Sequence, residues 1–202
     1  MNIFSSFEYL LFFLTLLAWR SSQPSYGSIS STVAARNPNG VFAVTHVVDI
    51  RRRASPPLQP NFFGNACARA IAMVENSSPE QDYYNLALKL REQMLKADAD
   101  YVRQLEDAGV FLLNYGMSEE NDPVFREERK TVKICSFVSW WRLSAYEVDF
   151  RWGKPVWVST IGVPVKNLIV FTGTNSGDGI EAWVSMLEED IVVIESNYNL
   201  IG

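Results

Sequence analysis

Residues 139–155 read SWWRLSAYEVDFRWGKP and form the most distinctive stretch of the chain. Three of the six tryptophans lie in it, and it closes on Gly153, Lys154 and Pro155. An ordered string of this composition seldom arises by chance. Strand-forming residues precede it at Thr131–Val138 and follow it at Val156–Ile161, so the stretch is predicted to connect two strands.

Two further segments are predicted as strands. Val41–Ile50 is dominated by Val, Ile, Phe and Thr, which suit a largely buried strand, and it follows the turn signal Asn37-Pro38-Asn39-Gly40. Leu168–Phe171 is a short apolar run. Ala54–Pro60 contains three prolines, which cannot donate to a strand ladder, so an extended connection is expected there.

Helices are predicted in two places. Between Glu80 and Asp107, apolar residues recur at spacings of 4, 3, 4, 3 and 4, which predicts one long helix with a core-facing stripe of Tyr83, Ala87, Leu90, Met94, Ala97 and Tyr101. Near the C-terminus, Asp178 and Glu181 have the spacing of a capping box, which predicts a helix with an apolar face of Ile180, Trp183, Val184, Leu187, Ile191 and Ile194. Helices and strands are therefore mixed, and the fold class is α/β, in the mixed α+β sense.

Composition excludes several classes of protein. The 202 residues are 48% hydrophobic, which is enough for a packed core, and the net charge of −5 offers no overall positive field for nucleic acid. The cluster Arg51-Arg52-Arg53 is more typical of structural pairing beside a strand. Two cysteines, Cys67 and Cys135, form neither a disulfide framework nor a zinc site, so no metal is expected and a cytoplasmic location fits best.

The N-terminal region is the least determined part of the sequence. Leu10–Trp19 is an apolar run of ten residues, whereas a membrane-spanning helix needs about 20. No Lys or Arg precedes it, as a secretory signal would require. We therefore expect a helix that belongs to the fold and no membrane association, with a signal peptide or anchor as the alternative. Ser21–Asn39 and the charged segment Ser118–Lys130 are expected to be linkers or loops.

One side chain has the chemistry of a general base. His46 is the only histidine, and it lies in Thr45-His46-Val47-Val48-Asp49 inside a predicted strand. Residues three apart on a strand project to opposite faces, so His46 and Asp49 should not meet. A strand histidine bonded to a neighbour is the preferred interpretation. Gly173–Gly179 lacks the Gly-Lys-Ser/Thr ending of a phosphate-binding loop and is predicted to be a turn into the last helix.

The stretch at 139–155 resembles the second signature of the BAHD acyltransferases, in which Ser-Trp, an Arg and an aromatic residue precede Asp-Phe-Gly-Trp-Gly-Lys-Pro. Other segments are similar to the family in the same order, namely Val48–Arg53, Pro56–Leu58, Asn61–Asn65, Gly177–Trp183 and, at the start, Leu14–Arg20. The resemblance covers nearly all of residues 14–202 and is greatest for the branch that includes vinorine synthase. It implies a chloramphenicol-acetyltransferase-like domain with a mixed sheet and flanking helices, over residues 26–202, after an apolar helix and linker at 1–25.

The resemblance also implies a function. Family members pass an acyl group from coenzyme A to an alcohol or amine, here of a plant secondary metabolite, with acyl-CoA as co-substrate and no bound cofactor. Their base is the histidine of an H-x-x-x-D motif in a first domain, and no such motif occurs in these 202 residues. No catalytic residue is therefore assigned. Ser139 and Trp140 correspond to positions that face the acceptor channel, although a core tryptophan and a strand-end serine are equally consistent with them.

The family further implies that the signature is structural. Arg51, Asn65, Asp149, Trp152 and Gly153 carry this part of the resemblance, and Asp149 is expected to pair with Arg51. One residue departs from the pattern, because Arg151 stands where the family has glycine. If the backbone there has a positive φ, the arginine costs about 1 kcal/mol or more.

Three hypotheses follow. The chain is a truncated acyltransferase, inactive unless a first domain is supplied; or it is a noncatalytic binding or regulatory half; or it is a truncated gene product without a role of its own. In each case the surface that meets the other domain in relatives would be apolar and open, which predicts self-association.

Overall fold

The computed structural model describes residues 41–75, 79–107, 132–141, 143–160, 162 and 165–197. The predictions for Leu10–Trp19, Ser21–Asn39 and Ser118–Lys130 lie outside these residues, and so does the proposed division of the chain near residue 25.

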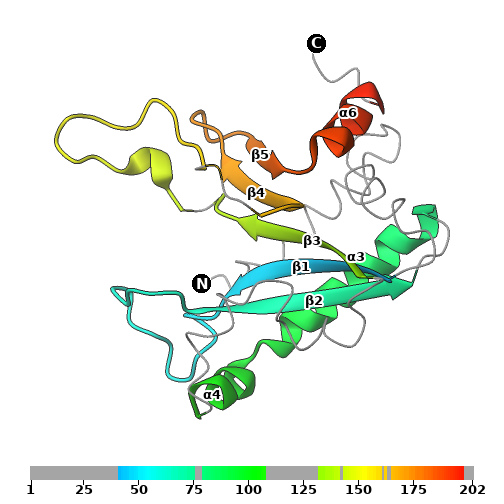
Figure 1. The fold of residues 1–202 in the computed structure, drawn as a ribbon. Helices are drawn as coiled ribbons and strands as arrows, with labels where there is room; N and C mark the ends of the chain where they lie inside the picture. Colours follow the sequence, from blue (N-terminus) through cyan, green and yellow to red (C-terminus); the bar gives the residue numbers. More distant parts are fainter. Residues whose placement is uncertain are drawn as a thin grey trace.

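A mixed five-stranded sheet forms the centre of the protein (Figure 1). Its strands are β1 (Val41–Asp49), β2 (Cys67–Glu75), β3 (Val132–Ser139), β4 (Leu168–Gly173) and β5 (Ile180–Ser185), in the order β2-β1-β3-β4-β5. The three central strands are parallel, and β2 and β5 are antiparallel edge strands. The predicted α/β class with a mixed sheet is therefore confirmed. The strands predicted at 41–50, 131–138 and 168–171 correspond to β1, β3 and β4.

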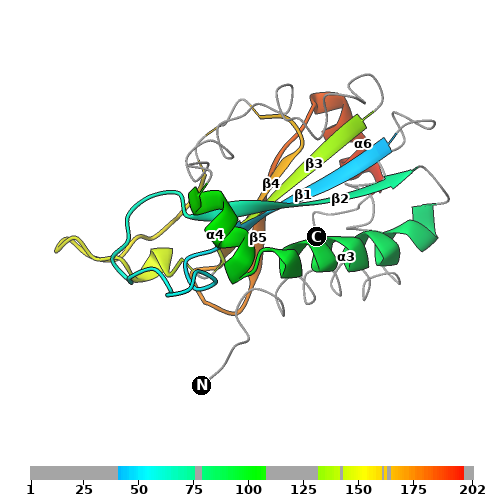
Figure 2. The same ribbon diagram turned by 90° about the horizontal axis from the view of Figure 1, so that it is seen from below.

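One face of the sheet is covered by α3 (Pro79–Lys96), as Figure 2 shows. Leu90 and Met94 of α3 and Val102 of the next helix pack in one buried cluster with apolar residues of the strands: Phe42, Val44, Val48, Ala68, Ala70, Ala72, Cys135, Ile169 and Phe171. These strand residues alternate along each strand, as side chains on one face must. This cluster is the main core.

Strand β2 was not predicted from the sequence. Ala68, Ala70 and Ala72 form its core-facing side, and alanine has little strand propensity. The strand forms because all nine of its residues pair with β1, from Val41 opposite Glu75 to Asp49 opposite Cys67. The small side chains let α3 lie close to the sheet.

The prediction of one helix over Glu80–Asp107 is wrong. The segment forms two helices, α3 and α4 (Ala99–Asp107), because Asp98 accepts a hydrogen bond from the backbone amide of Tyr101 and starts a new helix (2.9 Å). Arg53 ends the first helix by donating to the carbonyl oxygens of Met94 (2.5 Å) and Ala97 (3.1 Å). Leu90, Met94 and Ala97 are buried, so that part of the predicted stripe is confirmed.

The helix predicted from Asp178 is also wrong. Ile180–Ser185 is strand β5, and a helix, α6, begins only at Glu188 and runs to Asn197. Asp178 accepts hydrogen bonds from the hydroxyls of Ser176 and Thr174 instead of capping a helix. Gly177, at φ +77°, helps to reverse the chain between β4 and β5, so Gly173–Gly179 is a hairpin turn. The apolar residues here have the spacing of a helix, but the segment forms a strand because it pairs with β4.

Candidate functional site

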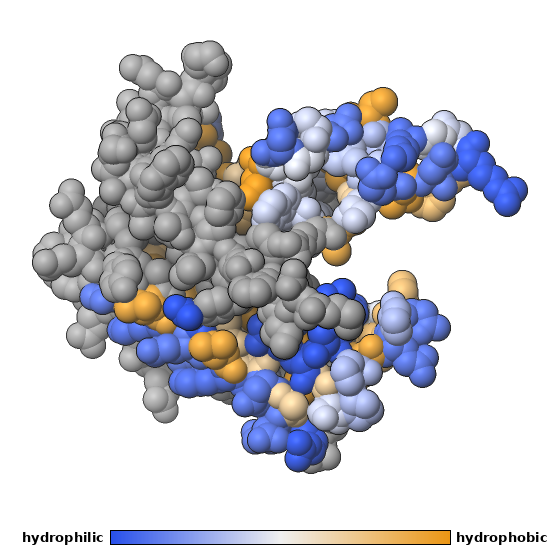
Figure 3. Space-filling view, turned by 180° about the vertical axis from the view of Figure 1, so that it is seen from behind, coloured by the Kyte–Doolittle hydropathy of each residue, from blue (hydrophilic) through white to orange (hydrophobic). Residues whose placement is uncertain are grey.

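Because β1, β3 and β4 are parallel, their carboxyl ends lie at one edge of the sheet. Two long connections leave from this edge and project in the same direction (Figure 1). We call residues 50–66 the arginine arm and residues 143–160 the signature arm. Figure 3 shows a hollow between the two projecting parts. Open α/β sheets commonly bind ligands outside the carboxyl ends of their strands, which makes this edge the candidate site.

The arginine arm is anchored by its first and third arginines. Arg51 pairs with Asp49 at 3.1 Å and donates to the carbonyl oxygen of Gly64, which ties the two ends of the arm together. Arg53 binds the end of α3, as described above, and burial lowers its pKa. Two apolar side chains of the arm are exposed, Phe62 and Phe63, the latter 100% accessible. Asn65, assigned to the structural signature, is exposed at the end of the arm.

The signature arm is held by its own polar contacts. The Asp149 carboxylate accepts hydrogen bonds from the backbone amides of Arg151 (2.7 Å) and Gly153 (3.1 Å). The Tyr146 hydroxyl accepts from the amide of Val158 at 3.1 Å, which joins the two sides of the arm. Since Val156–Thr160 belongs to this arm and to no strand, the strand predicted at 156–161 is wrong over its described residues.

The expected ion pair between Arg51 and Asp149 is not formed between these two described residues. Arg51 bonds to Asp49 at the end of β1 and to Gly64 in the arginine arm, and Asp149 bonds within the signature arm. The two arms project as separate parts, so each charged group bonds locally (Figure 1). This part of the family expectation is therefore wrong for this structure.

Two further signature residues lie in the exposed part of the arm. Trp152 is 84% accessible, and its ring lies 5.6 Å from that of Phe150. Gly153 has a φ of +105°, a conformation that favours glycine. Arg151 has a φ of +77°, so the condition under which an arginine there is strained is met.

Ser139 and Trp140 lie at the carboxyl end of β3, at the root of the signature arm. Ser139 is the last strand residue and is exposed. Trp140 is 40% accessible, and its amide donates to the carbonyl oxygen of Phe171 at 2.7 Å, which continues the β3–β4 ladder by one residue. The topology thus brings both residues to the candidate edge.

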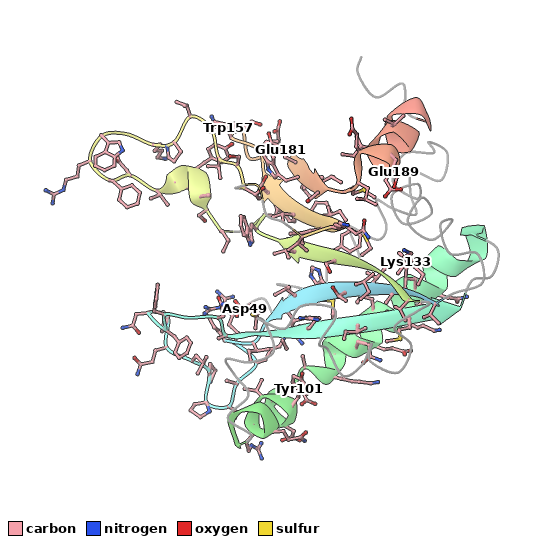
Figure 4. All side chains as sticks on the ribbon, in the orientation of Figure 1. Asp49, Tyr101, Lys133, Trp157, Glu181 and Glu189 are labelled. Atoms are coloured by element: carbon pink, nitrogen blue, oxygen red, sulfur yellow. The ribbon has the colours of Figure 1, made fainter. Side chains whose placement is uncertain are left out.

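A group that the sequence did not single out lies beside them. Trp183 of β5 donates from Nε1 to the Thr172 hydroxyl at 3.1 Å, and its ring meets Trp157 of the signature arm edge to face, 5.6 Å between centroids. Glu181 lies on β5 near Trp157 (Figure 4). Its Oε2 atom is buried without a hydrogen-bond partner. Because Ile180–Ser185 was predicted as a helix, the alternation that places Glu181 and Trp183 on one face was missed.

His46 lies in the middle of β1, opposite Phe137 of β3, and not at the candidate edge. Burial lowers its pKa from 6.5 to about 4, although a hydrogen bond to the backbone of Phe137 opposes this. Its Nδ1 atom is buried without a partner. Asp49 pairs with Arg51 instead. A neutral imidazole of such low basicity is a poor general base, which agrees with the interpretation as a strand histidine.

Other features that could indicate a function are a metal site, a disulfide and a membrane-spanning helix. Across the described ranges, no three His, Cys, Asp or Glu side chains are grouped to hold a metal ion. Neither Cys67 nor Cys135 forms a disulfide. Within the same part of the chain, none of the helices combines the length and apolar character needed to cross a bilayer.

Comparison with known proteins identifies the relatives of this chain. The model of the Transferase family matches residues 14–201. Limonoid 7-O-acetyltransferase of Citrus sinensis is 37% identical over 165 residues, which cover 79% of this chain and 35% of the relative. Vinorine synthase of Rauvolfia serpentina is 30% identical over 166 residues, covering 82% of this chain and 36% of the relative. The chain thus spans about a third of the length of these curated relatives.

Solved structures agree. The crystal structure of vinorine synthase superposes with a TM-score of 0.62 at 26% identity, over 89% of this chain and 42% of that one. TRI101 of F. graminearum, in complex with coenzyme A and deoxynivalenol, shares the fold at a TM-score of 0.60 and 19% identity, over 84% of this chain and 38% of that one. With the family match along nearly the whole sequence, these likenesses show that the chain belongs to the BAHD acyltransferase family.

Proposed function

We propose that these residues form the C-terminal lobe of an enzyme that transfers an acyl group from acyl-CoA to an alcohol or amine of a plant secondary metabolite. The family match over residues 14–201 is the observation that carries the proposal. The name of limonoid 7-O-acetyltransferase supports acetyl transfer onto an oxygen. The coenzyme A in the TRI101 complex supports acyl-CoA as co-substrate.

In this reaction the oxygen or nitrogen of the acceptor attacks the thioester carbonyl carbon, and the carbon–sulfur bond breaks. A base removes the acceptor's proton, and a proton returns to the departing thiolate, so the products are the ester or amide and free coenzyme A. We assign Ser139 and Trp140 to the wall of the acceptor site, because they lie at the carboxyl edge of the sheet, from which the two arms project.

We infer that the base comes from outside these 202 residues. His46 is the only histidine, and it lies inside the sheet with a pKa lowered to about 4. Since a general base typically contributes about 100- to 10,000-fold to the rate, the chain by itself should turn over negligibly.

The hollow between the two arms is the surface that we propose meets the other lobe. Large apolar side chains on the arms are exposed to water: Phe62, Phe63, Val148, Phe150 and Trp152. An open patch of this kind favours association. The isolated chain should therefore form concentration-dependent dimers or larger species by light scattering, and a Phe63→Ser/Trp152→Ser variant should form fewer. A strictly monomeric chain would contradict this assignment.

We propose a reducing compartment, the cytoplasm, because neither Cys67 nor Cys135 forms a disulfide.

The decisive experiment compares the chain alone with a chimera. In the chimera, these residues follow the histidine-bearing first lobe of vinorine synthase. Each protein is incubated with acetyl-CoA and a panel of alcohols and amines, and free thiol is measured. Thiol release by the chimera, with none by the 202-residue chain, supports the proposal. Release by the 202-residue chain that disappears in His46→Ala would overturn the assignment of the base, and a folded chimera without activity would count against the function.

A further inference from the structure

The face of the sheet opposite α3 carries a compact group of one carboxylate and two indole rings. Thr172 of β4 and Glu181 of β5 are register partners, and Trp183 follows Glu181 by two residues on the same face. Side chains two apart on a strand are within about 7 Å of each other. Trp157 reaches this group from the signature arm and contacts Trp183. Figure 4 shows Trp157 and Glu181 near one another at the root of the arm.

The carboxylate of Glu181 has no cation to balance it within the described residues. Its Oε2 atom is buried and makes no hydrogen bond. The neighbouring Thr172 hydroxyl accepts from Trp183 Nε1 and makes no hydrogen bond to this Oε2 atom. A buried carboxylate oxygen without a partner costs free energy that a cation would offset.

The two tryptophans determine which cation fits. Trp157 is 65% accessible, and its contact with Trp183 is edge to face at 66°, an arrangement that does not stack the two ring faces on each other. An organic ammonium or guanidinium ion is attracted to such a ring face and to a carboxylate beside it. A small metal ion would find a single carboxylate here, since no group of metal ligands occurs among the described residues.

We propose that Glu181, Trp157 and Trp183 form a binding site for an organic cation, either a protonated amine on a small molecule or a lysine or arginine side chain of a docking segment. Trp140 borders the site. Its amide continues the β3–β4 ladder, and the next residue, Trp141, contacts Gly173 on the α3 side of the sheet. Alternation therefore places Trp140 on the face of Thr172 and Glu181. The site does not depend on acyl transfer and is tested by binding alone.

The test follows the six indole Nε1–H signals of the chain by NMR, with single tryptophan variants as assignments. Tetramethylammonium chloride is the small-molecule probe, and tert-butanol, of similar shape but neutral, is its control at equal ionic strength. Nα-acetyl-lysine amide probes the side-chain source. Saturable shifts of Trp157 and Trp183 with either cation, at a Kd of about 1–10 mM, are expected. Tighter binding of tetramethylammonium would indicate a small-molecule amine as the ligand, and tighter binding of Nα-acetyl-lysine amide would indicate a protein side chain.

Two variants separate charge from packing. Glu181→Gln keeps the shape and should weaken cation binding at least about 5-fold. Trp157→Leu should weaken it similarly, and because Trp157 is exposed this variant remains informative if Glu181→Gln fails to fold. Trp152→Leu, on the same arm, is the matched control and should leave binding unchanged. Equal shifts with tert-butanol, unchanged binding in both variants, or no saturable shift with either cation would overturn the proposal.

Discussion

The sheet under α3 and the signature arm are held in their conformations by different interactions. Under α3 the side chains are common apolar residues, and Met94 is 1% accessible. In the arm the side chains are the most distinctive of the sequence, yet Trp152 is 84% accessible. Burial stabilises the first region, whereas the second is shaped by polar contacts to its own backbone. A distinctive motif is thus not the same as a structural core.

The largest difference between the two regions should appear on truncating one large side chain in each. Met94→Ala removes a fully buried side chain and should lower the free energy of unfolding by about 2–5 kcal/mol. Trp152→Ala removes a larger but exposed side chain and should change it by less than about 0.5 kcal/mol. Urea denaturation measures both. Equal losses would mean that the Trp152 side chain stabilises the fold as much as a core side chain does.

The next largest effect concerns pH and the buried imidazole. His46 has a pKa of about 4 in the folded chain against 6.5 when unfolded, so as pH falls from 6.5 to 4 the unfolded state takes up a proton that the folded state does not. The contribution of His46 to the free energy of unfolding is fully present above pH 6.5 and is lost as the pH falls from 6.5 to 4. Since one pKa unit corresponds to about 1.4 kcal/mol, the loss is up to about 3 kcal/mol.

His46→Gln provides the control, because glutamine is polar but does not titrate. The unfolding free energies of the unaltered chain and of the His46→Gln variant are compared from pH 7.5 to 4. The advantage of the unaltered chain over the variant should become smaller as the pH falls. A constant difference would show that the imidazole of His46 is as accessible to protons as that of a free histidine. No residue of the signature arm should produce a comparable dependence between pH 5 and 7, since the arm contains no histidine.

The smallest expected effect is a gain. Arg151 has a φ of +77°, and Arg151→Gly should raise the free energy of unfolding by about 1 kcal/mol. Arg151→Ala is the matched control and should give no such gain, because alanine retains the Cβ that causes the strain. A gain with alanine would assign the effect to the lost charge and side chain instead of the backbone.

The candidate site was only partly predictable. Ser139 and Trp140 were predicted from the resemblance to the family signature, and the topology places them at the carboxyl edge of the sheet. Glu181, Trp157 and Trp183 were not found, because their meeting depends on two features that local spacing did not reveal: that Ile180–Ser185 is a strand, and that the arm folds back onto it. The partner of Asp149 was predicted from the family and is wrong, since its nearest donors are amides of its own arm.

The sequence by itself determined the family and the three central strands, because rare residues in a fixed order and continuous runs of β-branched and aromatic residues are local signals. The tertiary structure decided the two edge strands and the break between α3 and α4. Alanine-rich Cys67–Glu75 and apolar Ile180–Ser185 are each compatible with more than one backbone conformation. Both segments are strands because their backbones hydrogen-bond to β1 and to β4 in the folded chain, and local sequence does not specify that pairing.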